Sequence, residues 1–141
     1  MRDLQYAVQV LLQEDCTCVL CKGGDIRKSH STGISPMLDW LAAGEELSGF
    51  SAADRIVGKA AAMLFALAGI RAVHAQVLSQ SALEFLNARN INVTYDVLTD
   101  SIRNRRNDGI CPMEQATAEL SVPEDAFPIL LATRERLRKG E

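Results

Sequence analysis

The chain of 141 residues has the length of one domain, taken here as residues 1–141, and with 48% hydrophobic residues it can bury a full core. Its formal net charge of −3 argues against a nucleic-acid-binding scaffold, and no segment has the roughly 20 strongly apolar residues of a membrane span. The N-terminus, MRDLQYAVQ, is amphipathic and charged, so we expect no secretion signal, a cytoplasmic location and four reduced cysteines.

The first third of the chain alternates between helix and strand patterns. Apolar residues spaced along one face predict a helix, short apolar runs that end at glycines predict a strand, and Pro36 is placed as a first helical residue. The predicted elements are a helix over residues 4–13, a strand over residues 16–22, a polar edge strand over residues 25–30, a helix from Ser35 to about Ala43 and a loop over residues 45–50.

The next stretch, SAADRIVGKAAAMLFALAGI, is predicted to be the central helix. Ser51 followed by Asp54 is a capping-box pattern for a helix start, and Gly69 is typical of a helix end. Residues 60–68 are apolar on every face, which predicts a helix buried between layers. Lys59 is the one charge kept next to this apolar run.

The second half continues the alternation, which favours the α/β class. The predicted elements are a strand over residues 71–78, a helix over residues 79–90, a strand over residues 91–98, a polar basic segment over residues 99–109, a short helix opened by Cys111-Pro112, and a last helix over residues 121–135. We therefore expect a three-layer α/β/α domain with a mixed sheet covered on both faces.

This order of elements resembles the cytidine-deaminase-like fold. LSQSALEFLNARNI, residues 78–91, resembles the deaminase stretch that carries Pro-Cys-x-x-Cys, and the resemblance places Val57-Gly58-Lys59 at the start of the helix that begins His-Ala-Glu. The positions of the zinc ligands then read Val57, Leu78 and Ser81, and the catalytic Glu position reads Lys59. Because zinc deamination needs three His or Cys ligands and a Glu, we expect no catalytic zinc, no cofactor and no deamination.

The chain as a whole is also similar to a small bacterial family of unknown function within that superfamily. The resemblance covers nearly the full length and is carried by DRIVGKAAA, residues 54–62, and NDGICPMEQAT, residues 107–117. It implies the fold but no established activity, so the chemistry has to be argued from the residues.

Lys59 is the first candidate catalytic residue. The resemblance implies that the start of its helix lines the pocket, where a desolvated amine would have a lowered pKa and could form a Schiff base with a carbonyl, including an open-chain sugar. Alternatively, Lys59 reaches water or pairs with Asp54. Asp54 would cap the helix or orient a ligand hydroxyl, and Gly58 would let a ligand or another backbone come close.

Cys111 is the second candidate catalytic residue. The sequence GICPMEQA predicts Cys111 at a helix N-cap, with Pro112 and Glu114 in the first turn. Free amides and the helix dipole stabilise a thiolate there, which favours a reactive thiol or an anion site that includes Glu114. The alternative is a buried capping residue, since free cysteines mostly behave as small hydrophobes.

A basic segment directly upstream is a candidate phosphate site. Arginine forks beside helix amides suit a phosphate or pyrophosphate, although a solvated loop is the alternative. The residues concerned are Arg103, Arg105, Arg106 and Asp108.

Cys16, Cys18 and Cys21 form a C-x-C-x-x-C pattern that would need a fourth ligand, such as Cys111 or His30, to hold a metal. On a strand, Cys16 and Cys18 would face one side and Cys21 the other, so we expect no metal site.

These observations favour a zinc-free protein that binds a nucleotide or a nucleoside-diphosphate-sugar ligand resembling ADP-ribose. Lys59 and Asp54 would line the floor of the pocket, and the segment from Arg103 to Cys111 would hold phosphate. The protein would either act on a ribosyl group through Lys59 or bind the ligand as a sensor.

The alternative is a non-catalytic interaction protein, with a closed pocket and Lys59 in an internal ion pair. An apolar set in the last helix could then serve a homodimer. Its members are Phe127, Ile129, Leu130 and Leu131.

Overall fold

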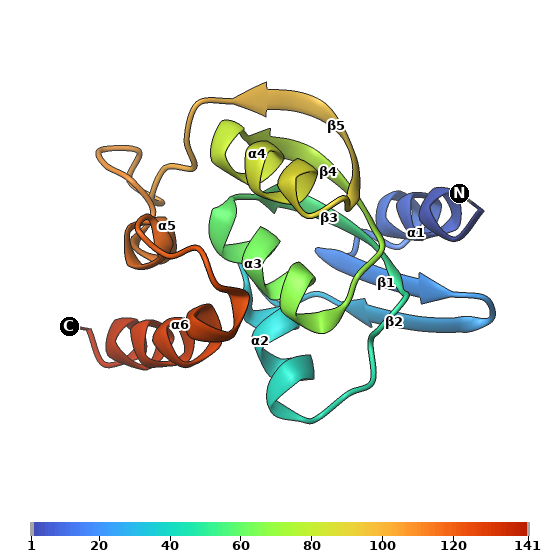
Figure 1. Cartoon of the computed structure of the whole chain (residues 1–141), viewed down its shortest axis with the longest axis horizontal. Coiled ribbons are helices and arrows are strands. Elements are labelled where there is room, and N and C mark those ends of the chain that lie inside the picture. Colours follow the sequence, from blue (N-terminus) through green and yellow to red (C-terminus); the bar gives the residue numbers. More distant parts are fainter. Residues whose placement is uncertain (1, 141) are drawn as a thin grey trace.

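The computed structural model describes residues 2–140, and its centre is a mixed five-stranded sheet in the order β2-β1-β3-β4-β5 (Figure 1). The first hairpin pairs antiparallel and joins β3 antiparallel, whereas β3, β4 and β5 run parallel to one another. The predicted mixed sheet and α/β class are therefore confirmed. The strands are β1 (Cys18–Lys22), β2 (Asp25–Ser29), β3 (Ser51–Val57), β4 (Ala72–Ser79) and β5 (Asn92–Thr99).

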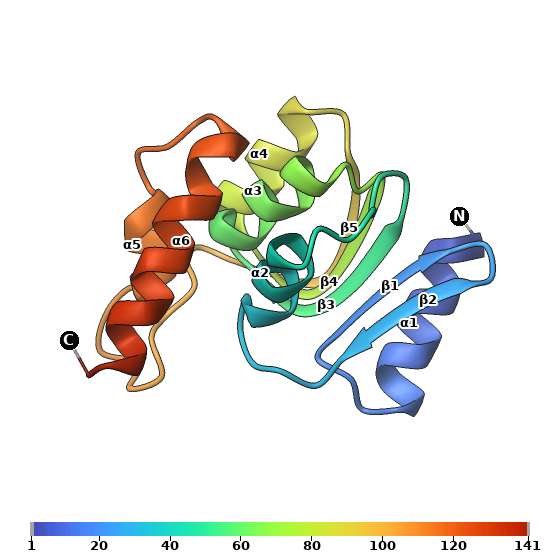
Figure 2. The ribbon, with the colours of Figure 1, turned by 90° about the horizontal axis from the view of Figure 1, so that it is seen from below.

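Helices lie on both faces of the sheet (Figure 2). One face carries α1, which packs against β1 and β3, and the other carries α2, α3 and α4. The last two helices, α5 and α6, pack against α3 from outside this layer. The helices are α1 (Arg2–Gln13), α2 (Ser35–Ala42), α3 (Lys59–Ala68), α4 (Gln80–Ala88), α5 (Pro112–Thr117) and α6 (Pro123–Arg138).

The segment predicted as the first turns of the central helix is instead the central strand. Ser51–Val57 forms β3, hydrogen-bonded to β1 on one side and to β4 on the other. Ala52 and Ala53 are fully buried, each against the helices of a different face. Hydrogen bonding to two neighbouring strands, together with burial of small side chains on both faces of the sheet, outweighs the capping-box pattern. Tertiary context overrides local propensity here.

The helix itself begins at Lys59, within the Val57–Lys59 stretch that the resemblance placed at a helix start. Its N-cap is Gly58, and it ends at Gly69 in the left-handed conformation (φ 81°), as predicted. Every residue from Ala60 to Phe65 is buried, while the last turn is partly exposed. The predicted burial is thus confirmed for the first half of the helix, which lies between the sheet and α6 (Figure 2).

Two apolar clusters stabilise the fold, a large one between the sheet and α2 to α6 and a small one under α1. The predicted placement of the cysteines is wrong: Cys16 and Cys21 both lie in the small cluster, and Cys18 lies in the large one. The reason is that β1 begins only at Cys18, so Cys16 does not follow the strand's alternation.

The apolar set predicted for a homodimer is mostly used inside the molecule. Leu130 is fully buried, and Phe127 and Leu131 pack against the large cluster. Ile129, with 37% exposure, is the member that faces solvent. Within residues 2–140, no helix is long and apolar enough to cross a membrane.

Candidate functional site

The candidate site lies at the carboxyl ends of the parallel strands β3 and β4, where α3 and α4 begin (Figure 1). Ligands of open α/β sheets generally bind at this edge, because loops and helix N-termini converge there. Here α5 packs against α3 and brings residues from the end of the chain to the same edge.

The first turn of α3 is capped by a carboxylate from α5. The backbone N–H of Lys59 donates to Oε1 of Glu114 at 2.8 Å, and that of Ala60 donates to Oε2 at 2.9 Å. The carboxylate thereby satisfies two amides that a helix start leaves free and places its charge at the positive end of the helix dipole. Glu114 therefore binds α3, whereas the sequence suggested that it binds a ligand.

Gly58 makes room for this carboxylate. A Cβ at position 58 would overlap the carboxyl group of Glu114, although the backbone of Gly58 has a negative φ of −102° that other residues also adopt. Glycine is thus needed at position 58 because the Glu114 carboxylate of the same chain occupies the space of a side chain. The backbone conformation does not require glycine.

The amine of Lys59 has a neutral partner. The residue is half-buried, and its Nζ donates to the backbone O of Ala118 at 3.0 Å. In the described part of the chain Lys59 makes no ion pair, so the alternative in which it pairs with Asp54 is not what the structure shows.

Asp54 is a buried strand residue and does not cap a helix. It is 7% exposed, and its Oδ1 accepts the N–H of Arg55 at 2.8 Å. Burial raises the pKa of Asp54 to about 8, although backbone hydrogen bonds from Arg55 and Ile56 pull it down. Its neighbour on β1 is Cys18, whose pKa is raised by burial and by the nearby carboxyl group. Asp54 is thus set to hold a proton near neutral pH.

The basic segment forms a small exposed hairpin between β5 and α5. A bridge joins Arg103 to Ile110, and Asp108 accepts a hydrogen bond from the amide of Asn104 at 2.8 Å, which stabilises the turn itself. The three arginines predicted to bind phosphate are exposed, so their guanidinium groups are available to an anion. They are Arg103, Arg105 and Arg106.

Cys111 is the N-cap of α5, as predicted, with Pro112 at the first helical position. Its side chain caps no amide, while its backbone N–H donates to the O of Ile102 at 3.0 Å. The thiol is half-buried at the junction of the hairpin and α5. Neither His30 nor His74 forms a hydrogen bond with it.

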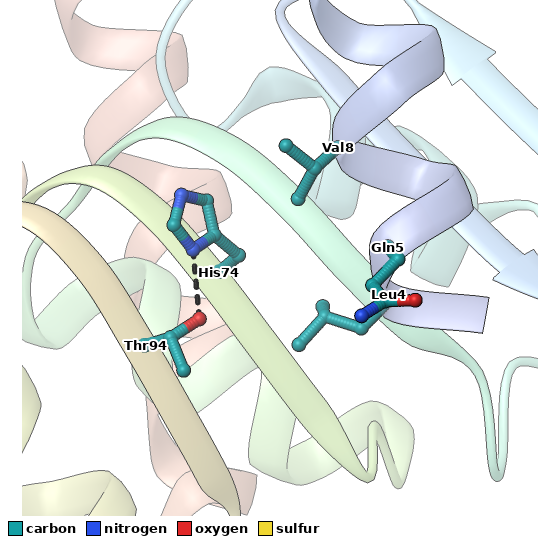
Figure 3. Close-up of a pocket in the computed structure, with 5 residues that line it drawn as sticks. All are labelled: Leu4, Gln5, Val8, His74 and Thr94. Atoms are coloured by element: carbon teal, nitrogen blue, oxygen red, sulfur yellow. Dashed lines mark hydrogen bonds between the residues drawn. The ribbon is translucent and has the colours of Figure 1, made fainter. Parts of the chain in front are cut away.

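Sequence reasoning missed a polar cluster on the other face of the sheet. Figure 3 shows His74 and Thr94 beside Leu4 and Val8 of α1, around a surface hollow of ≈ 400 Å³. The Nδ1 of His74 lies 2.7 Å from Thr94 Oγ1, and its Nε2 lies 3.4 Å from Asp96 Oδ1. The alternation of RAVHAQVL could have placed His74 on a face, but nothing in the sequence pairs it with β5.

No metal centre is found within residues 2–140, where no three His, Cys, Asp or Glu side chains gather. The mixed sheet, the helices on both faces and a lysine at the carboxyl edge define an α/β protein with a candidate site at the start of α3. The chain belongs to the DUF1893 family: residues 6–132 match the family described as a domain of unknown function.

A solved structure supports the same assignment. The crystal structure of the DUF1893 family protein TM1506 from Thermotoga maritima is similar to this chain, with a TM-score of 0.85 and 26% sequence identity. The similarity covers 93% of this chain and 89% of the other. Comparison with curated proteins finds no match.

Proposed function

We propose that the protein binds a nucleotide or nucleoside-diphosphate-sugar ligand resembling ADP-ribose at the carboxyl edge of β3 to β5. We further propose that the fold is a zinc-free variant of the cytidine-deaminase-like fold. The order of helix, hairpin, helix, strand, helix, strand, helix and strand supports this assignment, and Val57, Leu78 and Ser81 offer no zinc ligand.

The main observation behind the proposal is the position of the Lys59 amine and its hydrogen-bond partner. Its amine lies at the first position of α3, at the edge where ligands of such sheets bind, and its partner is a carbonyl and not a carboxylate. An amine that reaches this edge is a nucleophile of the kind that forms a Schiff base with a carbonyl group.

The reaction that suits this amine is Schiff-base formation with a ribosyl group. The neutral Nζ adds to the C1 aldehyde of the open-chain ribose to give a carbinolamine, which loses one water to form an imine. Both steps are reversible: water adds to the imine to restore the carbinolamine, which then expels the amine, and no electrons are exchanged. Cys111 is the alternative nucleophile, since its thiol could add to the same aldehyde.

The phosphates of such a ligand would bind the arginines. Glu114 already occupies the first amides of α3, so these amides are not free for a pyrophosphate. The exposed guanidinium groups of the hairpin supply both charge and paired donors. In the structure, Gly58 makes room for Glu114, Asp54 is buried, and Asp108 stabilises the turn of the hairpin.

Reductive trapping of the imine tests the proposal. The protein is incubated with ADP-ribose and cyanoborohydride and then denatured. Its mass is measured by mass spectrometry, and the modified residue is located by peptide mapping. We expect an adduct on Lys59 that Lys59→Ala removes and Cys111→Ser retains. Lys22→Ala is the matched control, because the Nζ of Lys22 also donates to a backbone carbonyl, that of Ser48 at 3.1 Å.

An adduct that survives Lys59→Ala, or that forms equally on Lys22, would overturn the proposed site.

The same experiment also tests the alternative, in which the chain is an interaction protein. A bare chain after trapping, together with a dimer in the native mass spectrum, would favour that alternative. Exposed apolar residues on the outermost strand β5, Tyr95, Val97 and Leu98, give it a surface.

A further inference from the structure

The polar cluster around His74 has no part in the proposed function. His74 of β4 and Thr94 of β5 are register partners near the amino ends of these strands, whereas the candidate site lies at the carboxyl ends. Asp96 follows two residues after Thr94, so it points to the same face of β5. The cluster is therefore separate from Lys59 and from the basic hairpin.

The imidazole of His74 lies between a hydroxyl group and a carboxylate. Its Nδ1 is 2.7 Å from Thr94 Oγ1, a contact drawn in Figure 3, and its Nε2 is 3.4 Å from Asp96 Oδ1. A carboxylate favours a proton on the ring nitrogen that faces it, which here is Nε2. Nδ1 then carries a lone pair, and the hydroxyl group of Thr94 donates its hydrogen bond to it.

This order of groups is the one that nucleophilic catalysis uses. A hydroxyl group is bonded to an imidazole base, and a carboxylate orients the base from its other side. The 3.4 Å distance between His74 and Asp96 is long for a hydrogen bond, as such contacts often are before a substrate binds. The side chain of His74 is 15% exposed, so the base is shielded, while Thr94 is exposed and can be reached.

An apolar hollow adjoins the hydroxyl group. Leu4 and Val8 of α1 form its wall opposite His74 and Thr94, and its volume is ≈ 400 Å³ (Figure 3). Such a wall suits the acyl chain of a substrate. Gln5 lines the same hollow, and a side-chain amide is one of the groups that stabilise the oxyanion in acyl transfer.

We propose that Thr94, His74 and Asp96 form a second site, which hydrolyses carboxylic esters that have a short apolar acyl group. Thr94 Oγ1 bonds to the carbonyl carbon while its proton passes to Nδ1 of His74, and the amide of Gln5 donates to the oxyanion. The tetrahedral intermediate then breaks its bond to the alcohol oxygen. His74 gives the proton to that oxygen, and the alcohol leaves.

Water completes the reaction. Its oxygen bonds to the acyl carbon while Nδ1 of His74 takes one of its protons; the bond to Thr94 Oγ1 then breaks, and the proton returns to that oxygen. One ester and one water thus give one carboxylic acid and one alcohol, and no electrons are exchanged. Asp96 touches no reacting atom and is a positioning residue, which fixes the tautomer of His74.

The test is the reaction of the full chain with p-nitrophenyl butyrate. We expect a burst of p-nitrophenol, and an acid quench should leave a butyryl group that peptide mass spectrometry locates on Thr94. Thr94→Val should remove the burst and this adduct, whereas Thr94→Ser should keep both. Thr32→Val is the matched control, because Thr32 is an exposed threonine outside the cluster.

Two further variants test the roles of the partners. His74→Gln should slow the burst about a hundredfold, because the base is lost. Asp96→Asn should lower kcat about tenfold or more and leave KM unchanged, because the tautomer of His74 is no longer fixed. Asp96→Glu should restore part of kcat, which a merely structural role of this side chain would not explain.

A wild-type chain without a burst would overturn the proposal, as would a burst that persists at the wild-type rate in Thr94→Val. If the cluster only ties β4 to β5, Thr94→Val lowers the melting temperature and no butyryl group is found on Thr94 in the wild type. If Thr94→Val does not fold, the position of the butyryl group in the wild type decides. Lys59→Ala should keep the burst, so this proposal and the proposed function fail separately.

Discussion

Asp54 shows how one buried acid can make the stability of the whole chain depend on pH. Burial raises its pKa from 3.8 to about 8 in the folded protein, whereas in the unfolded chain the carboxyl group meets water. Between these two values the unfolded state has released its proton and the folded state has not. Rising pH therefore favours unfolding across this window.

We predict that the free energy of unfolding falls as the pH rises from about 4 to about 8, by up to a few kcal/mol. In Asp54→Asn the side chain no longer titrates, so this part of the slope should disappear. Urea titrations at pH 5 and pH 8 measure the difference. Asp100→Asn, at an exposed loop position, should keep the wild-type slope. A slope unchanged in Asp54→Asn would assign the pH dependence to other groups.

The contact between Glu114 and α3 also shows the limit of what a single sequence predicts about individual residues. The local features were predictable: Cys111 as an N-cap, Pro112 after it, and an exposed basic turn. The contact itself joins positions 55 apart, and no spacing rule reaches that far. The role of Gly58 is hidden for the same reason, because its neighbour is a carboxylate from another element.

At the scale of elements, α3 is defined by its two ends. The C-terminal end depends on Gly69, whose φ of 81° is costly for any side chain. A Cβ there would also lie 3.0 Å from Ser48 Oγ and 3.2 Å from Ser48 Cα. The loop before β3 is tied to the same place, since the N–H of Gly49 donates to the O of Gly69 at 2.8 Å.

We predict that Gly69→Ala destabilises the protein by about 2–3 kcal/mol, through left-handed strain and the overlap with Ser48. Gly44→Ala is the matched control, because Gly44 also has a positive φ, 74°, but has no atom within 4 Å of an added Cβ. It should cost about 1 kcal/mol. Equal losses in urea unfolding would show that the overlap with Ser48 is relieved.

The two ends of α3 also explain which elements were predictable. Gly69 was identified because a helix end is signalled locally. The start was misplaced because SAADRIV carries a capping pattern and few strong strand formers, yet folds as the central strand. Its strand character comes from β1 and β4 on either side, and these neighbours are distant in sequence. Strands with their own β-branched runs, such as β5, were placed correctly.

At the scale of the whole molecule, Arg55 connects the N-terminal helix α1 to the central strand of the sheet. It lies on β3, and its guanidinium donates to the O of Cys16 at 2.9 Å and to the O of Leu11 at 3.0 Å, with Gln76 of β4 beside it. The end of α1 is thereby fastened to the central strand. The small apolar cluster lies under the same helix.

We predict that Arg55→Ala costs about 2–4 kcal/mol, because two carbonyls lose charged donors in a partly buried place. Amide hydrogen exchange should show α1 opening first, while the amides of α3 stay protected. Arg71→Ala, at an exposed position, should change neither. A uniform loss of protection over both helices would show that the two clusters unfold as one unit.

The cap on α3 has one more consequence, for the order in which the chain is made. The strand β3 and the helix α3 are synthesised before Glu114, so at that stage the first amides of the helix lack the carboxylate that caps them. Local contacts form early and distant ones late, because closing a long loop costs entropy. The lysine at the candidate site is therefore among the last places to be completed, when the C-terminal third of the chain arrives.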